Sequence, residues 1–390
     1  MDQPTRLASI LAIGISFASV PAPAGFAQQG ALLEDVVREL ERKLYDRAKR
    51  ELVAELARPI LRRARSTKTE VEERLLVHEL LESLGVSHLA LYSADTYQTM
   101  RTELSAETQP SLGVQLQELD GEYFACWIFE GGPADRAGIL RGDRVVAIDG
   151  VRPERSARLD WRSDDSALPD PPLHGLLCEE RDVVEFTLEG RPGQRRSVAV
   201  RAEPYGGWPA TLDSIRVLRE GDLRIGYVHF WFIPFDGPAR LLRELIAGEF
   251  ASCDALIVDL RGRGGSASEV PRMVDALAPT SKWDAPVICL SDRGTRSAKE
   301  VIADQVQKRE IALVVGERTA GAVIPATFRE VGRESVLMFP TSTLGRHTAN
   351  LEGIGVEPDV YVDDAFRYAA GRDPILEAGL RAAVAWCEEL

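Results

Sequence analysis

From residue 223 onward the sequence alternates short apolar runs with longer amphipathic stretches, and this alternation constrains the fold more than any other feature. The runs predict strands, and the stretches between them predict helices with one apolar face. Runs that are apolar throughout are typical of parallel strands covered on both faces. We therefore expect an α/β domain with a largely parallel sheet. The predicted strands are 224–230, 254–260, 285–290 and 311–315, and the predicted helices are 237–250, 269–277 and 297–307.

The beginning of the chain is predicted to be helical. Residues 31–64 carry apolar side chains at helical spacing, and we expect this helix or helix pair to break at Pro59, because proline removes a hydrogen bond from a helix interior. A second helix should begin at Thr69, which can form a capping box with Glu72, and should end at Gly85. Its predicted apolar positions are Val71, Leu75, Leu81 and Leu84, and the residues that follow, 86–92, are strand-like.

The middle of the chain has a different sequence pattern, which predicts short strands and glycine turns from about residue 110. A glycine-containing loop at 111–116 leads into a strand. In 131–150 a short helix capped by Gly138 runs into a turn and the strand 145–148. Further strands are expected at 183–188 and 198–201, and the Pro-rich, acidic stretch 164–172 is predicted to be an insertion loop.

Charge and cysteine usage exclude several classes of function. The chain has 390 residues with 47 Lys and Arg against 61 Asp and Glu, a net charge of −14, which argues against nucleic acid or an anionic membrane surface as the main partner. The five cysteines contain no CxxC pair, so a metal site is not indicated. A disulfide between Cys126 and Cys178 is one option, but small buried core residues are the favoured interpretation.

The N-terminal residues resemble a targeting segment. Arg6 precedes an apolar run from Leu7 to Val20, and the small residues Gly25 and Ala27 lie two apart, as at an export cleavage site. We expect residues 1–27 to be a signal peptide and the protein to be exported, either periplasmic or secreted. The alternative is an uncleaved membrane anchor.

Ser297 is the first candidate for chemistry. It stands at the mouth of an apolar strand and the start of a helix, where a turn can present a hydroxyl together with unbonded backbone N–H groups, as acyl transfer requires. Ser297 and Glu300 also fit a plain capping box, which is the structural alternative. Lys299 could be considered as a base, but residues two apart on a helix do not face each other.

The order of these motifs carries a family resemblance. The block 131–150 resembles a PDZ domain, and it is followed by Arg261–Gly265, by the serine segment 294–300 and by Gly316–Gly321. Together they resemble the tail-specific, or C-terminal processing, serine peptidases over most of the chain after residue 70. The resemblance implies an α/β multidomain fold with an N-terminal helical segment, a PDZ β-barrel-like domain and a ClpP/crotonase-like catalytic domain. It also implies that Ser297, three residues before Glu300, is the nucleophile.

The resemblance further selects a branch of that family. The Ser-Lys branch places its basic lysine at position 322, where this chain has alanine. The branch typified by the tricorn protease uses a Ser-His-Ser-Glu tetrad, and its motifs match Ser87-His88 and Glu352. His88 is then the base, since imidazole has a suitable pKa, while Ser87 and Glu352 would fix its tautomer. In a regular strand Ser87 and His88 would point oppositely, so their cooperation requires irregular backbone.

Two further sites follow from the resemblance. The oxyanion donors would be backbone N–H groups of Ala298 and of Gly265 or Ser266, although serine fits poorly if residue 266 needs a positive φ. The PDZ segment would bind the end of a polypeptide by strand addition, with its carboxylate near Leu112, Gly113 and Val114. The alternative is that it only packs against or gates the active site.

These observations define the expected organisation and function. We expect a signal peptide (1–27), a helical segment that contributes Ser87 and His88 (28–108), a PDZ domain (109–205) and a peptidase domain (210–390). The expected function is that of an exported serine endopeptidase acting on polypeptide substrates, especially C-terminal tails. We expect no metal, small-molecule cofactor or nucleic acid as a partner, and the sequence leaves open whether the chain forms a homo-oligomer. The alternative function is an inactive PDZ-containing adaptor that binds peptides.

Overall fold

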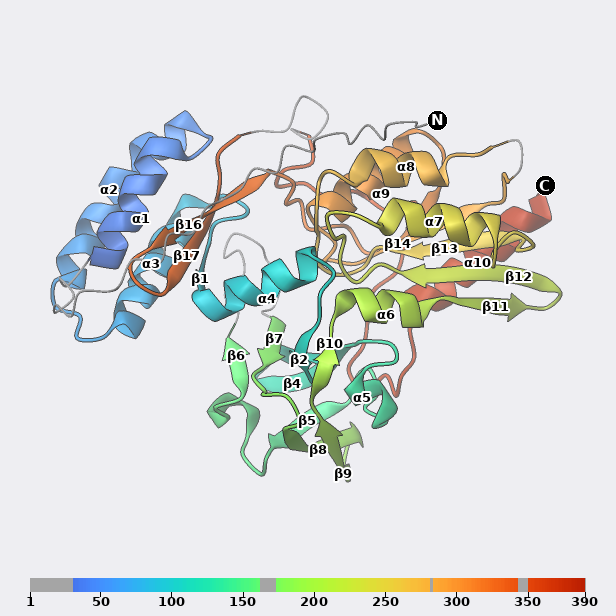
Figure 1. Cartoon of the computed structure of the whole chain (residues 1–390), viewed down its shortest axis with the longest axis horizontal. Coiled ribbons are helices and arrows are strands. Elements are labelled where there is room, and N and C mark those ends of the chain that lie inside the picture. The colour runs from blue at the N-terminus through green and yellow to red at the C-terminus, as the bar shows by residue number, and fades with distance from the viewer. Residues whose placement is uncertain (1–30, 162–172, 281–282, 343–349, 390) are drawn as a thin grey trace, which may run out of the picture.

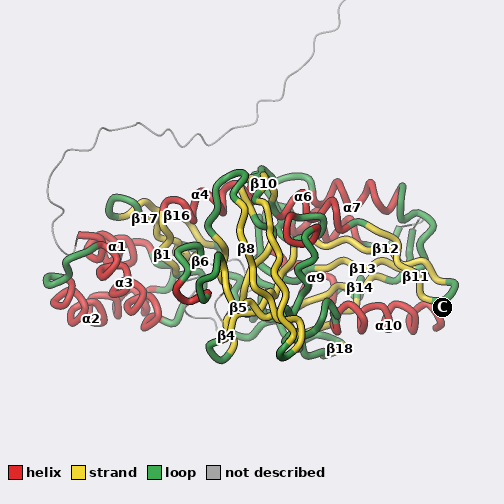
Figure 2. The backbone as a smooth tube through the Cα atoms, turned by 90° about the horizontal axis from the view of Figure 1, so that it is seen from below, coloured by secondary structure: helices red, strands yellow, loops and turns green. Residues whose placement is uncertain are grey.

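The computed structural model describes residues 31–161, 173–280, 283–342 and 350–389. The predicted signal peptide and the predicted insertion loop 164–172 lie outside this part of the chain. Three regions follow one another along the long axis of the molecule (Figures 1 and 2): a helical region with a small sheet, a seven-stranded sheet, and a six-stranded sheet flanked by helices. No helix among the described residues combines the length and apolar character needed to cross a membrane.

The six-stranded sheet confirms the predicted α/β class. Its strand order is β11-β12-β13-β14-β15-β18, with β11 antiparallel to β12 and every other neighbouring pair parallel. Helices α7, α8 and α9 cover one face and α10 covers the other (Figure 1). The elements are β11 (Arg216–Glu220), β12 (Leu223–His229), α7 (Pro238–Ala247), β13 (Ala255–Asp259), α8 (Val270–Leu277), β14 (Val287–Ser291), α9 (Ala298–Lys308), β15 (Leu313–Gly316), β18 (Val360–Tyr361) and α10 (Pro374–Glu389).

Alternation along the strands explains why both faces of this sheet are covered. In β13, Leu256 and Val258 pack with α7, α8 and α9, whereas Ala255 and Ile257 pack under α10. All residues of β13 and β14 are buried, as expected for parallel strands between two helical layers. The sheet is therefore a rigid base, and the loops after its strands lie at one edge, where open α/β sheets usually carry their functional residues.

The seven-stranded sheet occupies the middle of the chain, in the order β6-β7-β3-β4-β5-β8-β9. A separate two-stranded ladder pairs β2 with β10 and so brings residues 109–111 against 203–205. A short helix leads to Gly138, as predicted, and its C-terminal turn is closed by that glycine at φ 80°. The elements are β2 (Gln109–Ser111), β3 (Val114–Leu119), β4 (Glu122–Ile128), α5 (Pro133–Arg136), β5 (Arg144–Ile148), the 3-10 helix Pro153–Arg155, β6 (Leu159–Trp161), β7 (Leu173–Leu176), β8 (Val183–Arg191), β9 (Gln194–Arg201) and β10 (Glu203–Tyr205).

The helical region corrects one prediction. Helices α1 (Ala31–Lys43) and α2 (Arg47–Ala64) separate at residues 44–46, not at Pro59, which lies inside α2. Asp46 sets the break because its carboxylate accepts hydrogen bonds from the N–H groups of Ala48 (2.8 Å) and Lys49 (3.1 Å). Pro59 is exposed, so water can satisfy the carbonyl that it leaves unpaired at Glu55.

The second predicted helix has the expected ends. In α3 (Glu70–Leu84), Thr69 Oγ1 accepts from the Glu72 N–H, Glu72 accepts from the Lys68 N–H, and Gly85 closes the helix at φ 56°. The predicted core position Leu75 is wrong, since 57% of its surface is exposed. The buried positions of this helix include Leu76, Val77, Leu80, Leu81 and Leu84.

A small sheet joins this helical region to the C-terminal part of the chain. Strand β1 (Ala90–Ser93) pairs with β17 (Ser335–Pro340), which pairs with β16 (Ala326–Val331). Helix α4 (Ala94–Leu104) follows β1, and α6 (Gly207–Ser214) precedes the six-stranded sheet. The strand predicted over 86–92 is shorter than expected, and residues 86–89 form the turn between α3 and β1. This turn carries Ser87 and His88.

Candidate active site

Ser297 occupies a strained turn directly before α9. Its backbone has φ 57° and ψ −128°, a left-handed conformation that costs a non-glycine residue about 1–3 kcal/mol. Its N–H donates to Ala322 O at 2.8 Å, while its hydroxyl makes no hydrogen bond with another described residue. The capping-box alternative is therefore wrong, and the hydroxyl is left available for chemistry.

Glu300 performs a different task from capping. Its carboxylate accepts hydrogen bonds from the Thr319 hydroxyl and from the N–H groups of Gly321 (2.7 Å) and Ala322 (2.9 Å). Burial raises the pKa of this fully buried carboxyl to about 7, against the opposing effect of its three donors. Glu300 thus fixes the segment whose Ala322 carbonyl holds the backbone of Ser297. The sequence marked Glu300 only as a motif residue, because its partners lie about twenty residues further along.

The glycine turn at Gly264 and Gly265 lies against the serine. A Cβ atom on Gly264 would come within 2.5 Å of Ser297 Cβ, and one on Gly265 within 2.3 Å of Ile233 O. Gly265 has φ 144°, whereas Ser266 is not among the residues with positive φ, so the expected difficulty with serine at 266 does not arise. Both glycines are required by close backbone approach.

The same turn narrows the choice of oxyanion donors. The Ser266 N–H donates to Ile233 O at 2.8 Å and is already used, so Ser266 is wrong as a donor. The N–H groups of Gly265 and Ala298 donate no hydrogen bond to any described residue. These two remain the candidates for holding a developing negative charge next to Ser297.

His88 lies in the turn between α3 and β1 with φ 57°, which is the irregular backbone that cooperation with Ser87 requires. Ser87 Oγ and His88 Nδ1 lie 3.2 Å apart, within hydrogen-bond distance. Burial, with a smaller effect from the Arg296 guanidinium, lowers the pKa of His88 to about 3. The imidazole is therefore neutral at neutral pH, the state needed to accept a proton.

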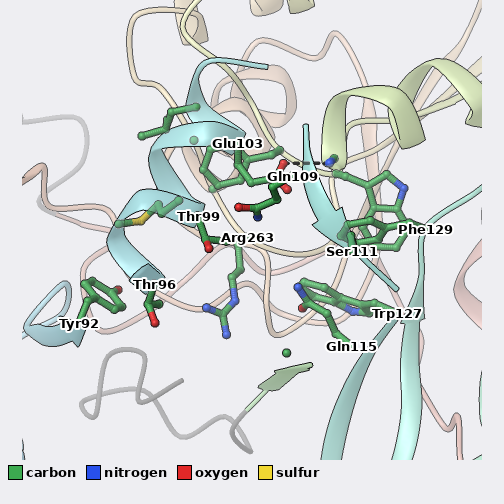
Figure 3. A pocket seen from close by; sticks show the side chains of 18 of the residues that line it. Tyr92, Thr96, Thr99, Glu103, Gln109, Ser111, Gln115, Trp127, Phe129 and Arg263 are labelled. Atoms are coloured by element: carbon green, nitrogen blue, oxygen red, sulfur yellow. Dashed lines mark hydrogen bonds between the residues drawn. The ribbon is translucent and has the colours of Figure 1, made fainter. Parts of the chain in front are cut away.

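One cavity brings the serine and the histidine together. It has a volume of about 460 Å³, and its lining includes His88, Ser297, Gly264 and Gly265. Figure 3 shows other walls of this cavity: Thr96, Thr99 and Glu103 project from α4, Gln115 and Trp127 from β3 and β4, and Arg263 reaches in from the glycine turn. Residues more than 200 positions apart in the sequence thus line the same space.

Glu352 is hydrogen-bonded to a residue other than the histidine. Its carboxylate accepts a hydrogen bond from the Val323 N–H at 3.0 Å and makes none with Ser87 or His88. Within the described residues, Ser87 is the hydrogen-bonding partner of the His88 ring. The structure thus shows no hydrogen bond from Glu352 to this pair, and Glu352 instead supports the segment after Ala322, whose side chain is completely buried.

The loop predicted to bind a peptide end is present, but part of the edge of the neighbouring strand β3 is already paired with another strand. The Gly113 N–H donates to Ser111 Oγ at 3.0 Å, and the Leu112 carbonyl accepts from Ala134. Strand β7 pairs with the outer edge of β3 at Leu116 and Gln117. Strand addition along β3 therefore competes with a strand of the chain itself, except next to Val114.

Comparison with known proteins agrees with these features. Residues 125–158 match the PDZ domain, and residues 272–362 match Peptidase family S41. This chain carries a PDZ domain and a domain of peptidase family S41. The PDZ match covers β4, α5 and β5, and the S41 match contains Ser297, Glu300 and Glu352.

Relatives of the chain carry names that belong to the same family. Tricorn protease homolog 2 of Streptomyces coelicolor is 30% identical over 364 residues, which cover 84% of this chain and 29% of the relative. The carboxy-terminal-processing protease of Bartonella bacilliformis is 26% identical over 251 residues, which cover 59% of this chain and 56% of the relative. The chain thus spans under a third of the first relative and just over half of the second.

Solved structures show the same fold. The photosystem II D1 C-terminal processing protease matches with a TM-score of 0.52 at 18% identity, over 90% of this chain and 99% of that protein. The tricorn protease matches with a TM-score of 0.53 at 15% identity, over 93% of this chain and 37% of that chain. At these identities the likeness concerns the fold alone.

Trp231, which the sequence analysis did not select, contacts residues of the PDZ match from the end of strand β12. Its indole N–H donates to Glu130, and its ring lies 4.6 Å from that of Phe129 and 4.0 Å from that of His229 between ring centroids. The sequence could have pointed to this residue through one feature, which is that it is an aromatic residue after the strand β12. Phe129, which lies within the PDZ match, and Trp231 both line the cavity that contains Ser297 and His88.

Of the five cysteines, Cys178 alone is among the residues that line this cavity. All five are free, so the disulfide considered between Cys126 and Cys178 is wrong. Cys126 points within the PDZ sheet, where its thiol donates to Gln115 O. Burial raises the pKa of the Cys126 and Cys289 thiols to about 12, so both are inert core residues, as the favoured interpretation held.

Proposed function

We propose that this chain is a serine endopeptidase that cleaves polypeptides through an acyl-enzyme on Ser297. The observation that carries the proposal is the shared cavity, which is lined by a serine with an unbonded hydroxyl, a neutral histidine and Gly265 with its unbonded amide, while the unbonded Ala298 amide comes directly after the serine. Serine is a weak nucleophile unless a base takes its proton, and a positioned imidazole contributes roughly 10²–10⁴ in rate. The names of the relatives support the same chemistry.

The first half of the reaction uses both sides of the cavity. Ser87 Oγ accepts the Nδ1 proton of His88, which leaves Nε2 to take the Ser297 proton as Oγ attacks the scissile carbonyl. The carbonyl electron pair moves to oxygen, and the N–H groups of Gly265 and Ala298 hold that oxyanion. When the intermediate collapses, the C–N bond breaks and His88 gives its proton to the departing amine.

The second half repeats these steps with water. His88 takes a proton from water, whose oxygen attacks the Ser297 ester, and the amides again hold the oxyanion. The ester C–O bond then breaks, Ser297 Oγ recovers the proton from His88, and the acid product leaves. No metal or cofactor is needed for this sequence.

Glu352 has a positioning role in this proposal. It holds the Val323 amide, one residue beyond the Ala322 carbonyl that fixes Ser297. In the tricorn-type pattern the corresponding glutamate would brace the histidine, which here requires Glu352 to leave the Val323 amide. We therefore assign the bracing of His88 in this state to Ser87 alone.

The substrate class follows from the cavity and from the PDZ domain. A volume of about 460 Å³ can take several residues of an extended chain but not a folded domain. We propose flexible C-terminal tails as substrates, with the terminal carboxylate taken by the Leu112 N–H next to Gly113. The export proposed for residues 1–27 predicts a mature protein that begins at Gln28, which mass spectrometry of the secreted or periplasmic chain would measure.

A fluorophosphonate probe tests the proposal. Such a probe forms a phosphonyl ester only with an activated serine, so the protein should be labelled at Ser297, and Ser297→Ala should abolish both labelling and peptide hydrolysis. Peptide binding without labelling or turnover would instead support the inactive adaptor. Hydrolysis that persists in Ser297→Ala would overturn the assignment of the nucleophile.

A further inference from the structure

Lys299 is a completely buried lysine two residues after Ser297, in the first turn of α9. It does not line the cavity that Ser297 faces, because side chains two positions apart point to different sides of a helix. It is therefore not the base for Ser297. A buried lysine is costly unless its ammonium group has partners, so its retention next to the proposed nucleophile requires a reason.

The partners of Lys299 are two backbone carbonyls. Nζ donates to Trp231 O at 3.0 Å and to Arg261 O at 2.7 Å. These carbonyls follow the ends of β12 and β13, respectively. The chain that continues from each of them meets the other, since Ile233 N–H donates to Gly264 O at 3.2 Å and Ser266 N–H donates to Ile233 O.

This arrangement links the two halves of the proposed oxyanion hole. One donor, the Ala298 N–H, belongs to α9, and the other, the Gly265 N–H, belongs to the turn after Arg261. Lys299 belongs to α9, and its ammonium group donates hydrogen bonds to both segments that build that turn. A Cβ on Gly264 would strike Ser297, so the turn and the serine already lie at closest approach.

The carboxylates of Asp259 and Asp292, whose charges act on Lys299, form their hydrogen bonds with other residues. Asp259 binds Arg261 and Tyr227, and Asp292 accepts from the Gly262 N–H and the Thr295 hydroxyl. No carboxylate among the described residues forms an ion pair with Lys299, and burial lowers its pKa to about 7 despite the attraction of Asp292 and Asp259. Its contribution therefore comes through hydrogen bonds to the backbone and not through a salt bridge.

We propose that Lys299 is a positioning residue that holds the glycine turn against the first turn of α9, so that the Gly265 and Ala298 amides converge on one point beside Ser297. The inference rests on the proposed function. It adds that the spacing of the two donors is maintained by this side chain, although the side chain touches neither substrate nor oxyanion. A displacement of about 1 Å at such a site can cost 10²-fold in rate.

Lys299→Met tests the proposal, because methionine has similar length and no donor. We expect kcat on a peptide substrate to fall about 10- to 100-fold with KM changed less than about threefold. A peptide boronate, whose tetrahedral adduct on Ser297 places an oxygen in the oxyanion hole, should lose affinity by a similar factor. Lys299→Gln, whose NH₂ group can still donate hydrogen bonds, should recover part of both losses.

Lys308→Met is the matched control. Lys308 ends the same helix, is largely exposed, and pairs with Asp304 far from the cavity. It should retain the kcat and boronate affinity of the wild type. A Lys299→Met protein with lower thermal stability but unchanged kcat and boronate affinity would show a merely structural lysine and overturn the proposal.

The design separates this inference from the proposed function. If Ser297→Ala keeps its activity, the proposed function fails. If Ser297→Ala is inactive while Lys299→Met matches the wild type, the peptidase assignment stands and the role of Lys299 is refuted. Equal losses of kcat and of ground-state peptide binding in Lys299→Met would indicate general disruption and would also count against a positioning role.

Discussion

Ser297 and His88 share a positive φ of 57°, which is unusual outside glycine, but other residues support the two very differently. The Ser297 turn is held by Ala322, by the glycine turn and by the two buried residues that follow it, Lys299 and Glu300. The His88 ring is held by Ser87. Strained conformations persist only where surrounding structure determines them, so the serine side is built to keep its geometry while the histidine side has fewer constraints.

The electrostatic surroundings of Ser297 and His88 also differ, and again the serine side has more supporting groups. The serine side offers two unbonded amides to a developing negative charge, which are worth more in a buried site than in water. The histidine side offers no carboxylate within the described residues to the positive charge that would develop on the ring, and the Arg296 guanidinium opposes it. The proposed site is thus prepared for the oxyanion more completely than for the imidazolium.

The largest test of this contrast is His88→Ala. We expect kcat/KM to fall by roughly 10²–10⁴, with the remaining activity coming from the oxyanion donors and substrate binding. His78→Ala is a suitable control, since His78 belongs to the neighbouring helix α3 and does not line the cavity. Equal activity of His88→Ala and wild type would eliminate His88 as the base.

Glu300→Gln tests the support on the serine side. A glutamine has one carbonyl oxygen for the three donors that Glu300 binds, and its NH₂ group would face an N–H. We expect a loss of about 1–3 kcal/mol in the free energy of unfolding and roughly a 10-fold fall in kcat at pH 8. Asp304→Asn, in the same helix, should lose far less in both urea unfolding and turnover.

The comparison also indicates what a sequence can and cannot predict. The α/β sheet, the caps of α3 and the glycine turns were predictable because periodicity and turn chemistry are local. The break at Asp46 was missed because Pro59 was exposed and could be tolerated in α2. Ser297 and His88 were predicted from motifs and their roles stay predictions, but the partners of Lys299 and Glu300 depend on contacts between distant strands, which local sequence does not encode.

Glu352→Gln examines whether the histidine side gains support during the reaction. A glutamine carbonyl can still accept the Val323 N–H, so we expect kcat/KM to fall only about two- to fivefold if Glu352 keeps the position that it has here. Glu352→Ala, which leaves that amide without an acceptor, should fall further. A loss in Glu352→Gln as large as that in His88→Ala would instead mean that the carboxylate moves to the histidine in the transition state.

The smallest expected effect is the response of the wild type to mild acid. Because burial lowers the pKa of His88 to about 3, the base stays unprotonated well below pH 6.5, and titration of this ring should change kcat/KM by less than about twofold between pH 7 and pH 5. The stability that this lowered pKa contributes is present above pH 6.5 and is lost as the pH falls through about 3. Glu300 has the opposite effect on how the stability depends on pH. Its raised pKa stabilises the fold below pH 4.5, and this contribution is lost as the pH rises through about 7. Rates from pH 4 to 8, measured beside circular dichroism in the wild type and in Glu300→Gln, would separate the two groups. An acid limb centred near pH 6.5 that persists in folded Glu300→Gln would show that the His88 ring is hydrated or paired with a carboxylate during turnover.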